Sequence, residues 1–199
     1  MKELIVATKN KGKLREIKEL LKGFELNITS LAEYPDAPEI IEDGKDFSEN
    51  ALIKARIIAE YTGKLVIGED SGIEVEYLNN APGIYSSRFA GEAASDDDNN
   101  NKLIMALEGI PKEKRKARYR CFAALIDGEK TVGVVDGSCE GYITTEPHGE
   151  NGFGYDPYFF IEAYGKTFGE LDPAIKSKIS HRAKALMKVK ALIKQVVGN

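Results

Sequence analysis

The chain has 199 residues, a formal net charge of −4 at pH 7, and 42% hydrophobic and 30% charged residues, which is typical of one globular domain spanning residues 1–199. The acidic balance excludes a general nucleic-acid binder, and no apolar run approaches the roughly 18 residues of a membrane span. The two cysteines form neither a disulfide framework nor a CxxC motif, and residues 1–13 lack the apolar stretch of a signal peptide. Both features favour the reducing cytoplasm.

The first part of the chain alternates strands with helices. The apolar run at residues 4–7 predicts a buried strand, and apolar residues at helical spacing predict a helix over 14–23. A further strand and a proline-containing loop lead to a helix over about 47–62, which begins at a capping box formed by Asp46 and Glu49. This order is typical of strands that lie in a sheet covered by helices.

Strands become more frequent in the second part of the chain. A strand at 65–70 is followed by an alternating strand at 72–78 and by a turn-rich segment at 79–100, whose length is typical of a functional or mobile loop. The later elements are a helix over 98–108, two strands joined by the Asp127–Gly128 turn, a glycine-rich loop at 146–157, a short strand at 158–161 and an amphipathic helix over 180–197. The expected fold class is α/β, with a mixed central β-sheet flanked by helices.

A basic loop, "TKNKGK" at residues 8–13, lies between the first predicted strand and the first predicted helix. Backbone N–H groups and the helix dipole favour an anion at a helix start, and the ammonium groups of Lys9, Lys11 and Lys13 suit a polyphosphate. The spacing is not that of a Walker A loop. Taken alone, the segment also fits a solvated basic turn.

Two adjacent acids, Glu69 and Asp70, are followed by Ser71 at the end of the predicted strand 65–70. Neighbouring carboxylates repel one another unless a cation lies between them, and Mg²⁺ takes such oxygen ligands together with phosphates. On its own the segment predicts either a metal site or an acidic turn between two strands.

Two later segments combine aromatic, glycine and donor residues. The loop "GFGYDP" at 152–157 lets backbone approach a ligand closely and offers an aromatic face that can stack on a base. The segment "KSKISHR" at 176–182 places donors just before the last predicted helix, where an anion or a carbonyl-bearing base fits. A tight turn and a structural histidine explain each segment singly, but together with the basic loop and the acids they predict a nucleoside triphosphate site.

The chain resembles the Ham1-like family of noncanonical purine nucleoside triphosphate pyrophosphatases, also called inosine triphosphate or dITP/XTP pyrophosphatases. The resemblance runs almost end to end and rests on five motifs in family order: "ATKNKGKLREI" (7–17), "EDGKDFSENALIKA" (42–55), "EDSGIEVEYLNNAPGIYSSRFAG" (69–91), "GFGYDP" (152–157) and "KSKISHRAKAL" (176–186). It implies an elongated, two-lobed α/β fold with substrate in the cleft between the lobes, and a homodimer.

The implied reaction is hydrolysis of the α–β phosphoanhydride of ITP, dITP or XTP, giving the nucleoside monophosphate and pyrophosphate, with Mg²⁺ as cofactor. Such an enzyme clears deaminated purines from the nucleotide pool. Its partner is a small-molecule nucleotide, and neither nucleic acid nor a membrane is involved.

The same resemblance implies a role for each matching residue. Asp70 would be the catalytic acid–base residue, and Glu42, Glu69 and Asp70 would hold the metal, with Glu39 as the alternative to Glu42. The triphosphate would be bound by Thr8, Lys9, Asn10, Lys11, Gly12, Lys13 and Lys54. The other substrate contacts would come from Ser71, from a wall around the stacked purine made by Phe153, Gly154, Tyr155 and Asp156, and from the base-recognising Lys176, His181 and Arg182.

This chain departs from the family pattern at two positions. The family usually has two aspartates before the serine, and here the first is Glu69, which reaches one methylene further. Lys9 stands where the family usually has glycine, which bears on how closely the backbone approaches a phosphate there.

Two other readings compete with this assignment. One is a Maf-like pyrophosphatase that acts on another modified nucleotide, and a substrate panel separates the two. The other is a nucleotide-binding regulatory module that does not hydrolyse its ligand. Such a module would have no need of Glu69 and Asp70, so their presence weighs against it.

Overall fold

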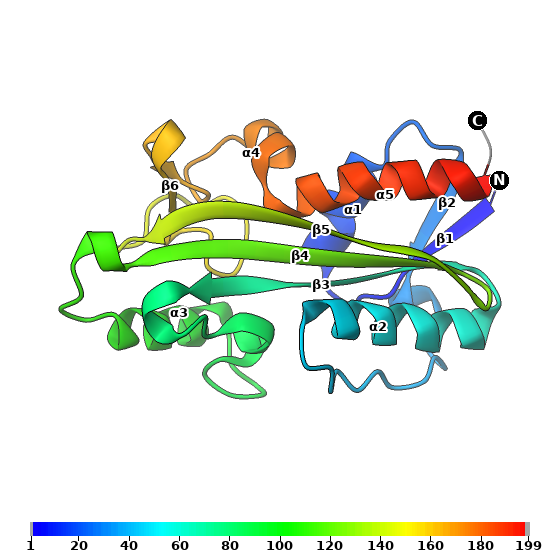
Figure 1. Cartoon of the computed structure of the whole chain (residues 1–199), viewed down its shortest axis with the longest axis horizontal. Coiled ribbons are helices and arrows are strands. Elements are labelled where there is room, and N and C mark those ends of the chain that lie inside the picture. Colours follow the sequence, from blue (N-terminus) through cyan, green and yellow to red (C-terminus); the bar gives the residue numbers. More distant parts are fainter. Residues whose placement is uncertain (1, 198–199) are drawn as a thin grey trace. The chain divides into compact units, whose positions relative to one another are not determined.

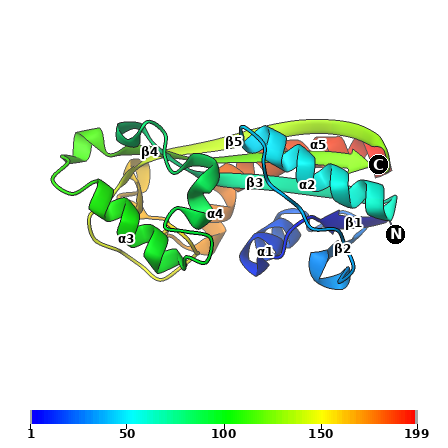
Figure 2. The same cartoon turned by 90° about the horizontal axis from the view of Figure 1, so that it is seen from below.

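The computed structural model describes residues 2–197 of the chain. Its elements are labelled in Figure 1 and seen from below in Figure 2. The chain forms two compact units. Unit 1 contains the described residues of Met1–Asp70, Cys121–Gly137 and Arg182–Asn199, and unit 2 contains Ser71–Arg120 and Ser138–His181.

The strands of both units pair into one mixed sheet. Their bounds are β1 Lys2–Val6, β2 Leu26–Ser30, β3 Leu65–Val75, β4 Lys116–Asp127, β5 Lys130–Ile143, β6 Phe159–Ile161 and β7 Lys166–Thr167. The order across the sheet is β2-β1-β3-β4-β5-β6-β7. β1 is parallel to β2 and β3, whereas β6 is antiparallel to β5 and β7. The predicted mixed sheet with flanking helices is confirmed.

Five α-helices and five short 3₁₀ helices are present among the described residues. The α-helices are α1 Lys11–Leu20, α2 Phe47–Thr62, α3 Asp96–Ala106, α4 Pro173–Ile179 and α5 His181–Val197. The 3₁₀ helices are η1 Leu31–Glu33, η2 Glu76–Leu78, η3 Gly83–Arg88, η4 Lys112–Lys114 and η5 Glu162–Tyr164. None of the helices within residues 2–197 combines the length and the apolar character that a membrane crossing would need.

Side-chain caps explain where the observed helices differ from the predicted ones. α1 begins at Lys11 rather than at residue 14, because the Asn10 side chain accepts a hydrogen bond from the Lys13 N–H and caps the first turn. α4 was not predicted as a separate helix. It starts at Pro173, directly after the capping side chain of Asp172.

The prediction of two strands at 65–70 and 72–78 is wrong, because β3 runs without interruption from Leu65 to Val75. Glu69 and Asp70 therefore lie inside a strand and not in an acidic turn. Both are buried, at 3% and 6% exposure. A buried carboxylate inside a strand is tolerated only where cations or donors meet it.

Two apolar layers cover the two faces of the strands in unit 1. Alternate residues of one strand point to opposite faces, so that Leu4 and Val6 pack with α1 and α5 whereas Ile5 packs with α2. Figure 1 shows α1 and α5 on one side of these strands and α2 on the other. The periodicity of β1 thus fixes which helix each side chain meets, and burial of each large side chain stabilises the unit by about 1.5–3 kcal/mol.

Unit 2 has its own aromatic-rich core. Its fully buried members include Ile73, Phe159 and Phe168. The Tyr119 ring meets the Phe159 ring edge-on, with centroids 4.7 Å apart. This core supports the glycine-rich loop that precedes β6.

A polar network at the start of β1 joins three segments of unit 1. Glu3 accepts hydrogen bonds from the Tyr34 hydroxyl at 2.6 Å and the Thr29 hydroxyl at 2.9 Å, and it pairs with the Lys64 ammonium at 2.7 Å. The hydrogen bond from Lys64, followed by that from Tyr34, lowers the pKa of Glu3 from its ordinary value of 4.5.

We expect Glu3→Gln to lower the free energy of unfolding by about 1 kcal/mol at pH 7, a small effect because Glu3 and Lys64 are partly exposed to solvent. The pKa of Glu3 is lower in the folded state, so its contribution is present above 4.5 and is lost as the pH falls through the folded value. Urea unfolding of both proteins across this range checks the prediction. A difference that stays constant into acid would contradict it.

Candidate active site

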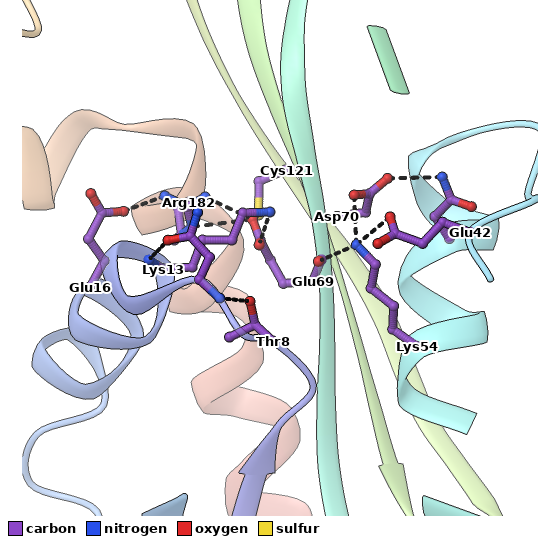
Figure 3. Close-up of polar contacts among 11 residues, drawn as sticks. Thr8, Lys13, Glu16, Glu42, Lys54, Glu69, Asp70, Cys121 and Arg182 are labelled. Atoms are coloured by element: carbon purple, nitrogen blue, oxygen red, sulfur yellow. Dashed lines mark hydrogen bonds and ion pairs between the residues drawn. The ribbon is translucent and has the colours of Figure 1, made fainter. Parts of the chain in front are cut away.

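Glu69 and Asp70 leave β3 toward opposite faces, as adjacent residues of a strand do (Figure 3). Glu69 points toward α1 and the start of α5. Asp70 points toward α2 and the loop before it. All the partners described below for the two acids belong to unit 1.

On the α1 side, the Glu69 carboxylate lies between two cations. Its Oε2 forms an ion pair with the Lys13 Nζ at 2.9 Å, and its Oε1 accepts from the Arg182 Nε and Nη2 at 3.2 and 3.1 Å. The Cys121 thiol also donates to this Oε1, at 3.2 Å. Arg182 in turn pairs with Glu16 of α1. The result is a buried cluster of alternating charges.

On the α2 side, the Lys54 ammonium is the central charge. It lies 3.0 Å from Asp70 Oδ1 and 2.6 Å from Glu42 Oε2, and it donates to the backbone carbonyl of Glu69 at 3.3 Å. The second oxygen of Asp70 accepts from the Asn50 amide at 3.1 Å. The two carboxylates therefore converge on one cationic point.

The close approach of α2 to β3 depends on Gly68, the residue before the two acids. A Cβ atom at this position would lie 2.2 Å from the Ala51 carbonyl oxygen and 2.6 Å from the Ala55 nitrogen. These are backbone atoms of α2, so they cannot move aside individually. Glycine here lets Asn50 and Lys54 reach Asp70.

Burial and charge act on the site in opposite directions. Burial raises the pKa of Asp70 above its ordinary value, although the nearby Lys54 and Lys13 charges partly oppose the shift. Burial alone disfavours the charged form of Lys54, but Asp70 and Glu42 outweigh it and raise the pKa of Lys54. Asp70 is thus a carboxylate poised to accept a proton, beside an amine that stays charged.

The basic loop is ordered as the start of α1 and not as a free turn. Thr8 Oγ1 accepts from the Asn10 N–H at 3.1 Å, and the Asn10 side chain caps the helix. The first backbone N–H groups of α1 and the side chains of Lys11 and Lys13 are therefore gathered at a helix N-terminus, where a phosphate is favoured.

A pocket of about 650 Å³ opens beside this loop within unit 1. Thr8, Lys9, Glu42 and Lys54 line its polar side. Glu39, the alternative to Glu42 as a metal ligand, also lines it, but it is Glu42 that pairs with Lys54. The pocket wall thus contains the start of the basic loop and two members of the acid–amine cluster, Glu42 and Lys54.

The Asp70 and Glu42 carboxylates fit a divalent cation. Their oxygens already approach one positive atom, the Lys54 Nζ. Among residues 2–197, no three His, Cys, Asp or Glu side chains form a group that could hold a metal ion. A cation held by two carboxylates, with waters and phosphates completing its shell, is the mode that Mg²⁺ uses.

The loop predicted to bind the base lies in unit 2 and is held by its own acid. Asp156 Oδ2 accepts from the Phe153 N–H at 2.8 Å and from the Lys176 Nζ at 2.7 Å. The Lys176 ammonium also lies 5.2 Å from the centre of the Phe153 ring. Gly152 has a φ of +86°, and a Cβ there would lie 1.9 Å from Asp156 Oδ2. The structure thus brings Phe153, Asp156 and Lys176 together.

Other predicted residues of unit 2 have different surroundings. The His181 ring stacks on Tyr119 with centroids 4.5 Å apart and an interplanar angle of 7°. The Tyr155 hydroxyl donates to the Ser86 carbonyl, and the Gly154 carbonyl accepts from the Asn100 amide. Ser71 continues β3 directly after Asp70.

The structure does not bring together the three residues that were predicted to hold the metal. Glu42 and Asp70 lie together, whereas the Glu69 carboxylate lies on the opposite face with Lys13. Arg182, predicted to recognise the base, is 1% exposed and pairs with Glu69 and Glu16. The roles of all these residues stay predictions.

Sequence reasoning missed Glu16, Asn50 and Gly68 as site residues. Glu16 and Asn50 lie inside motifs quoted for the family resemblance, so their place in those motifs was the available signal. Gly68 could have been found as a glycine inside a buried strand, which marks a close backbone approach.

Comparison with known proteins identifies the family of this chain. The Ham1 family model matches residues 4–192. The dITP/XTP pyrophosphatase of Bacillus licheniformis is 52% identical, with 98% of this chain and 100% of the relative covered. The dITP/XTP pyrophosphatase of Desulforamulus reducens is 47% identical, with 98% of this chain and 96% of the relative covered. The solved structure of a HAM1 protein from Coxiella burnetii is 40% identical in sequence, with a TM-score of 0.88. The match covers 98% of this chain and 100% of that structure's chain. The chain therefore belongs to the Ham1 family.

Proposed function

We propose that this protein is a nucleoside triphosphate pyrophosphatase that hydrolyses deaminated purine nucleotides, namely ITP, dITP and XTP, to the nucleoside monophosphate and pyrophosphate. The observation that carries the proposal is that Glu42 and Lys54, which line the same pocket as Thr8 and Lys9 of the basic loop, form an acid–amine cluster with the buried Asp70. Relatives matched over nearly their full length are dITP/XTP pyrophosphatases. The Maf-like alternative is not favoured by these relatives.

The basic loop would bind the triphosphate. The N-terminus of α1, capped by Asn10, offers backbone N–H groups, and Lys13 adds a partly exposed ammonium. Lys9 and Lys54 face the adjoining pocket. These positive groups would neutralise the pyrophosphate as it leaves.

Asp70 would orient a water molecule and accept its proton. Burial raises the pKa of its carboxyl, which makes it a better base than an exposed aspartate. Asn50 and Lys54 each bind one oxygen of the carboxylate and so fix its direction. Asp70 and Glu42 would hold Mg²⁺, which when bound supplies Lewis-acid polarisation of the phosphoryl oxygens.

Base selection would fall to unit 2. Phe153 would offer its ring for stacking on the purine, and Lys176 and His181 would recognise the 6-keto oxygen of hypoxanthine or xanthine. ATP carries an amino group at that position, so a donor aimed there would be left unpaired, and such mismatches reject strongly. Ser71 and Arg182 complete the predicted substrate contacts.

We also propose that the protein works in the cytoplasm as a homodimer. Both cysteines are buried thiols, which is consistent with a reducing compartment. The homodimer rests on the family resemblance alone.

A substrate panel tests the proposed function. The purified protein would be given ITP, dITP, XTP, ATP and GTP with Mg²⁺ and, in a parallel arm, with EDTA, and pyrophosphate and orthophosphate would be assayed separately. We expect pyrophosphate from the deaminated nucleotides, little turnover of ATP, and no turnover with EDTA, while the GTP arm shows whether the 6-keto oxygen alone decides selection. Orthophosphate as the first product would overturn the proposed bond cleavage, and tight binding without turnover would indicate the regulatory module.

A further inference from the structure

We propose that Glu69 is a positioning residue for the triphosphate and not a metal ligand: its carboxylate fixes the Lys13 ammonium at the start of α1 and is itself held by Arg182. This inference rests on the proposed function, because it assigns Lys13 to the phosphates. It differs from what the family resemblance implies, which places Glu69 in the metal site.

The direction of the Glu69 side chain is the first argument. Asp70 and Glu42 converge on Lys54 at the α2 face, while the Glu69 carboxylate lies at the α1 face with Lys13 and Arg182 (Figure 3). Toward Lys54, Glu69 presents its backbone carbonyl, at 3.3 Å. A cation held by Asp70 and Glu42 would therefore lie across the strand from the Glu69 carboxylate.

The charges of the cluster are the second argument. Glu16, Arg182, Glu69 and Lys13 carry two negative and two positive charges, and each is placed next to an opposite one. Glu69 and Arg182 have side-chain exposures of only 1% and 2%. Charges so deeply buried need their partners, so the position of the Glu69 carboxylate is fixed by Arg182 from one side.

The exposure of Lys13 is the third argument. Its side chain is 16% exposed, far more than those of Glu69 at 1% and Arg182 at 2%. An ammonium has three N–H donors, and its contact with Glu69 Oε2 is an ion pair, so that donors remain for a phosphate. Lys13 is a long side chain that loses rotamer freedom when it binds an anion, and a prior ion pair removes part of that cost.

The test is a double-mutant cycle between Glu69 and Lys13. Glu69→Gln, Lys13→Met and the double variant would be compared with the unmodified protein. Readouts are kcat and KM for ITP, the Mg²⁺ concentration for half-maximal activity, and the Kd of a non-hydrolysable α,β-methylene ITP analogue measured by calorimetry. The cycle isolates the interaction of the two side chains from their separate effects.

We expect Glu69→Gln to raise KM and the analogue Kd about 10-fold, with kcat and the Mg²⁺ midpoint changed less than about 3-fold. In the Lys13→Met background the same change would have little further effect. Glu19→Gln is the matched control: it removes an exposed carboxylate of the same helix that pairs with Lys22 outside the cluster, so KM should stay within about 3-fold. Glu42→Gln should instead shift the Mg²⁺ midpoint.

A shifted Mg²⁺ midpoint for Glu69→Gln with unchanged analogue binding would overturn the inference in favour of a metal ligand, and additive effects with Lys13→Met would overturn it as well. Circular dichroism would verify folding. If Glu69→Gln does not fold, Glu69→Asp, one methylene shorter, should show the same pattern more weakly. Failure of the proposed function is distinguishable, since it would appear as absent pyrophosphate release by the unmodified protein, whereas the calorimetric cycle needs no turnover.

Discussion

Asp70→Asn is expected to lower kcat for ITP hydrolysis by about 10²–10⁴-fold, the usual contribution of a general base. The amide has nearly the shape of the carboxylate, so the contacts with Asn50 and Lys54 can persist in part, but it cannot accept a proton from water. Steady-state kinetics with a pyrophosphate assay measures the effect. Substrate binding should change much less than turnover, because the phosphate loop is untouched.

The pH dependence of the unmodified protein provides the control for Asp70. Burial raises the pKa of its carboxyl, so the reactive carboxylate form is lost as the pH falls through that raised value, and kcat should fall with it. The residual activity of Asp70→Asn should not show this fall. A variant that retains the kcat of the unmodified protein would remove Asp70 from the role of base.

Gly68→Ala is expected to destabilise the protein by about 1–3 kcal/mol and to reduce activity strongly. The added methyl group would meet the Ala51 carbonyl and the Ala55 nitrogen at well below contact distance. α2 must then move away from β3, and Lys54 moves with it away from Asp70. Urea unfolding and the ITP assay together check both parts of the prediction.

Gly133→Ala is the matched control for this effect. Gly133 also lies in a strand of unit 1, but the atoms nearest to a Cβ there belong to the Leu192 side chain, whose methyl groups would lie at 3.1 Å. A flexible side chain can give way where a helix backbone cannot. Equal losses in the two variants would show that strand glycines as such, and not the approach of α2, account for the effect.

Much of the fold was accessible from the sequence because its signals are local. The apolar run at 4–7 and the helical spacing at 47–62 have the period of the structure they form. The continuous strand β3 was missed, because a Glu-Asp-Ser-Gly sequence has the composition of a turn. What keeps it a strand is tertiary: Lys13, Lys54 and Arg182 meet the two acids from either face.

The candidate site was accessible in its residue types but not in its grouping. Glu69 and Asp70 are adjacent in sequence, which suggested shared ligation of one metal. Because both residues lie inside strand β3, their side chains point to opposite faces of the sheet. Arg182 pairs with Glu16, which lies 166 positions away in the chain, and no local sequence pattern predicts a contact over such a separation.

The order of the elements along the chain separates β1 from the helix α5 that completes its core. α5 follows every other described element, yet its Leu186 and Val189 pack in one core with Leu4 of β1. Arg182, near its start, pairs with Glu69, which in turn pairs with Lys13. During synthesis β1 can therefore complete this core only after α5 has formed, and until then its apolar surface is exposed to chaperones and proteases.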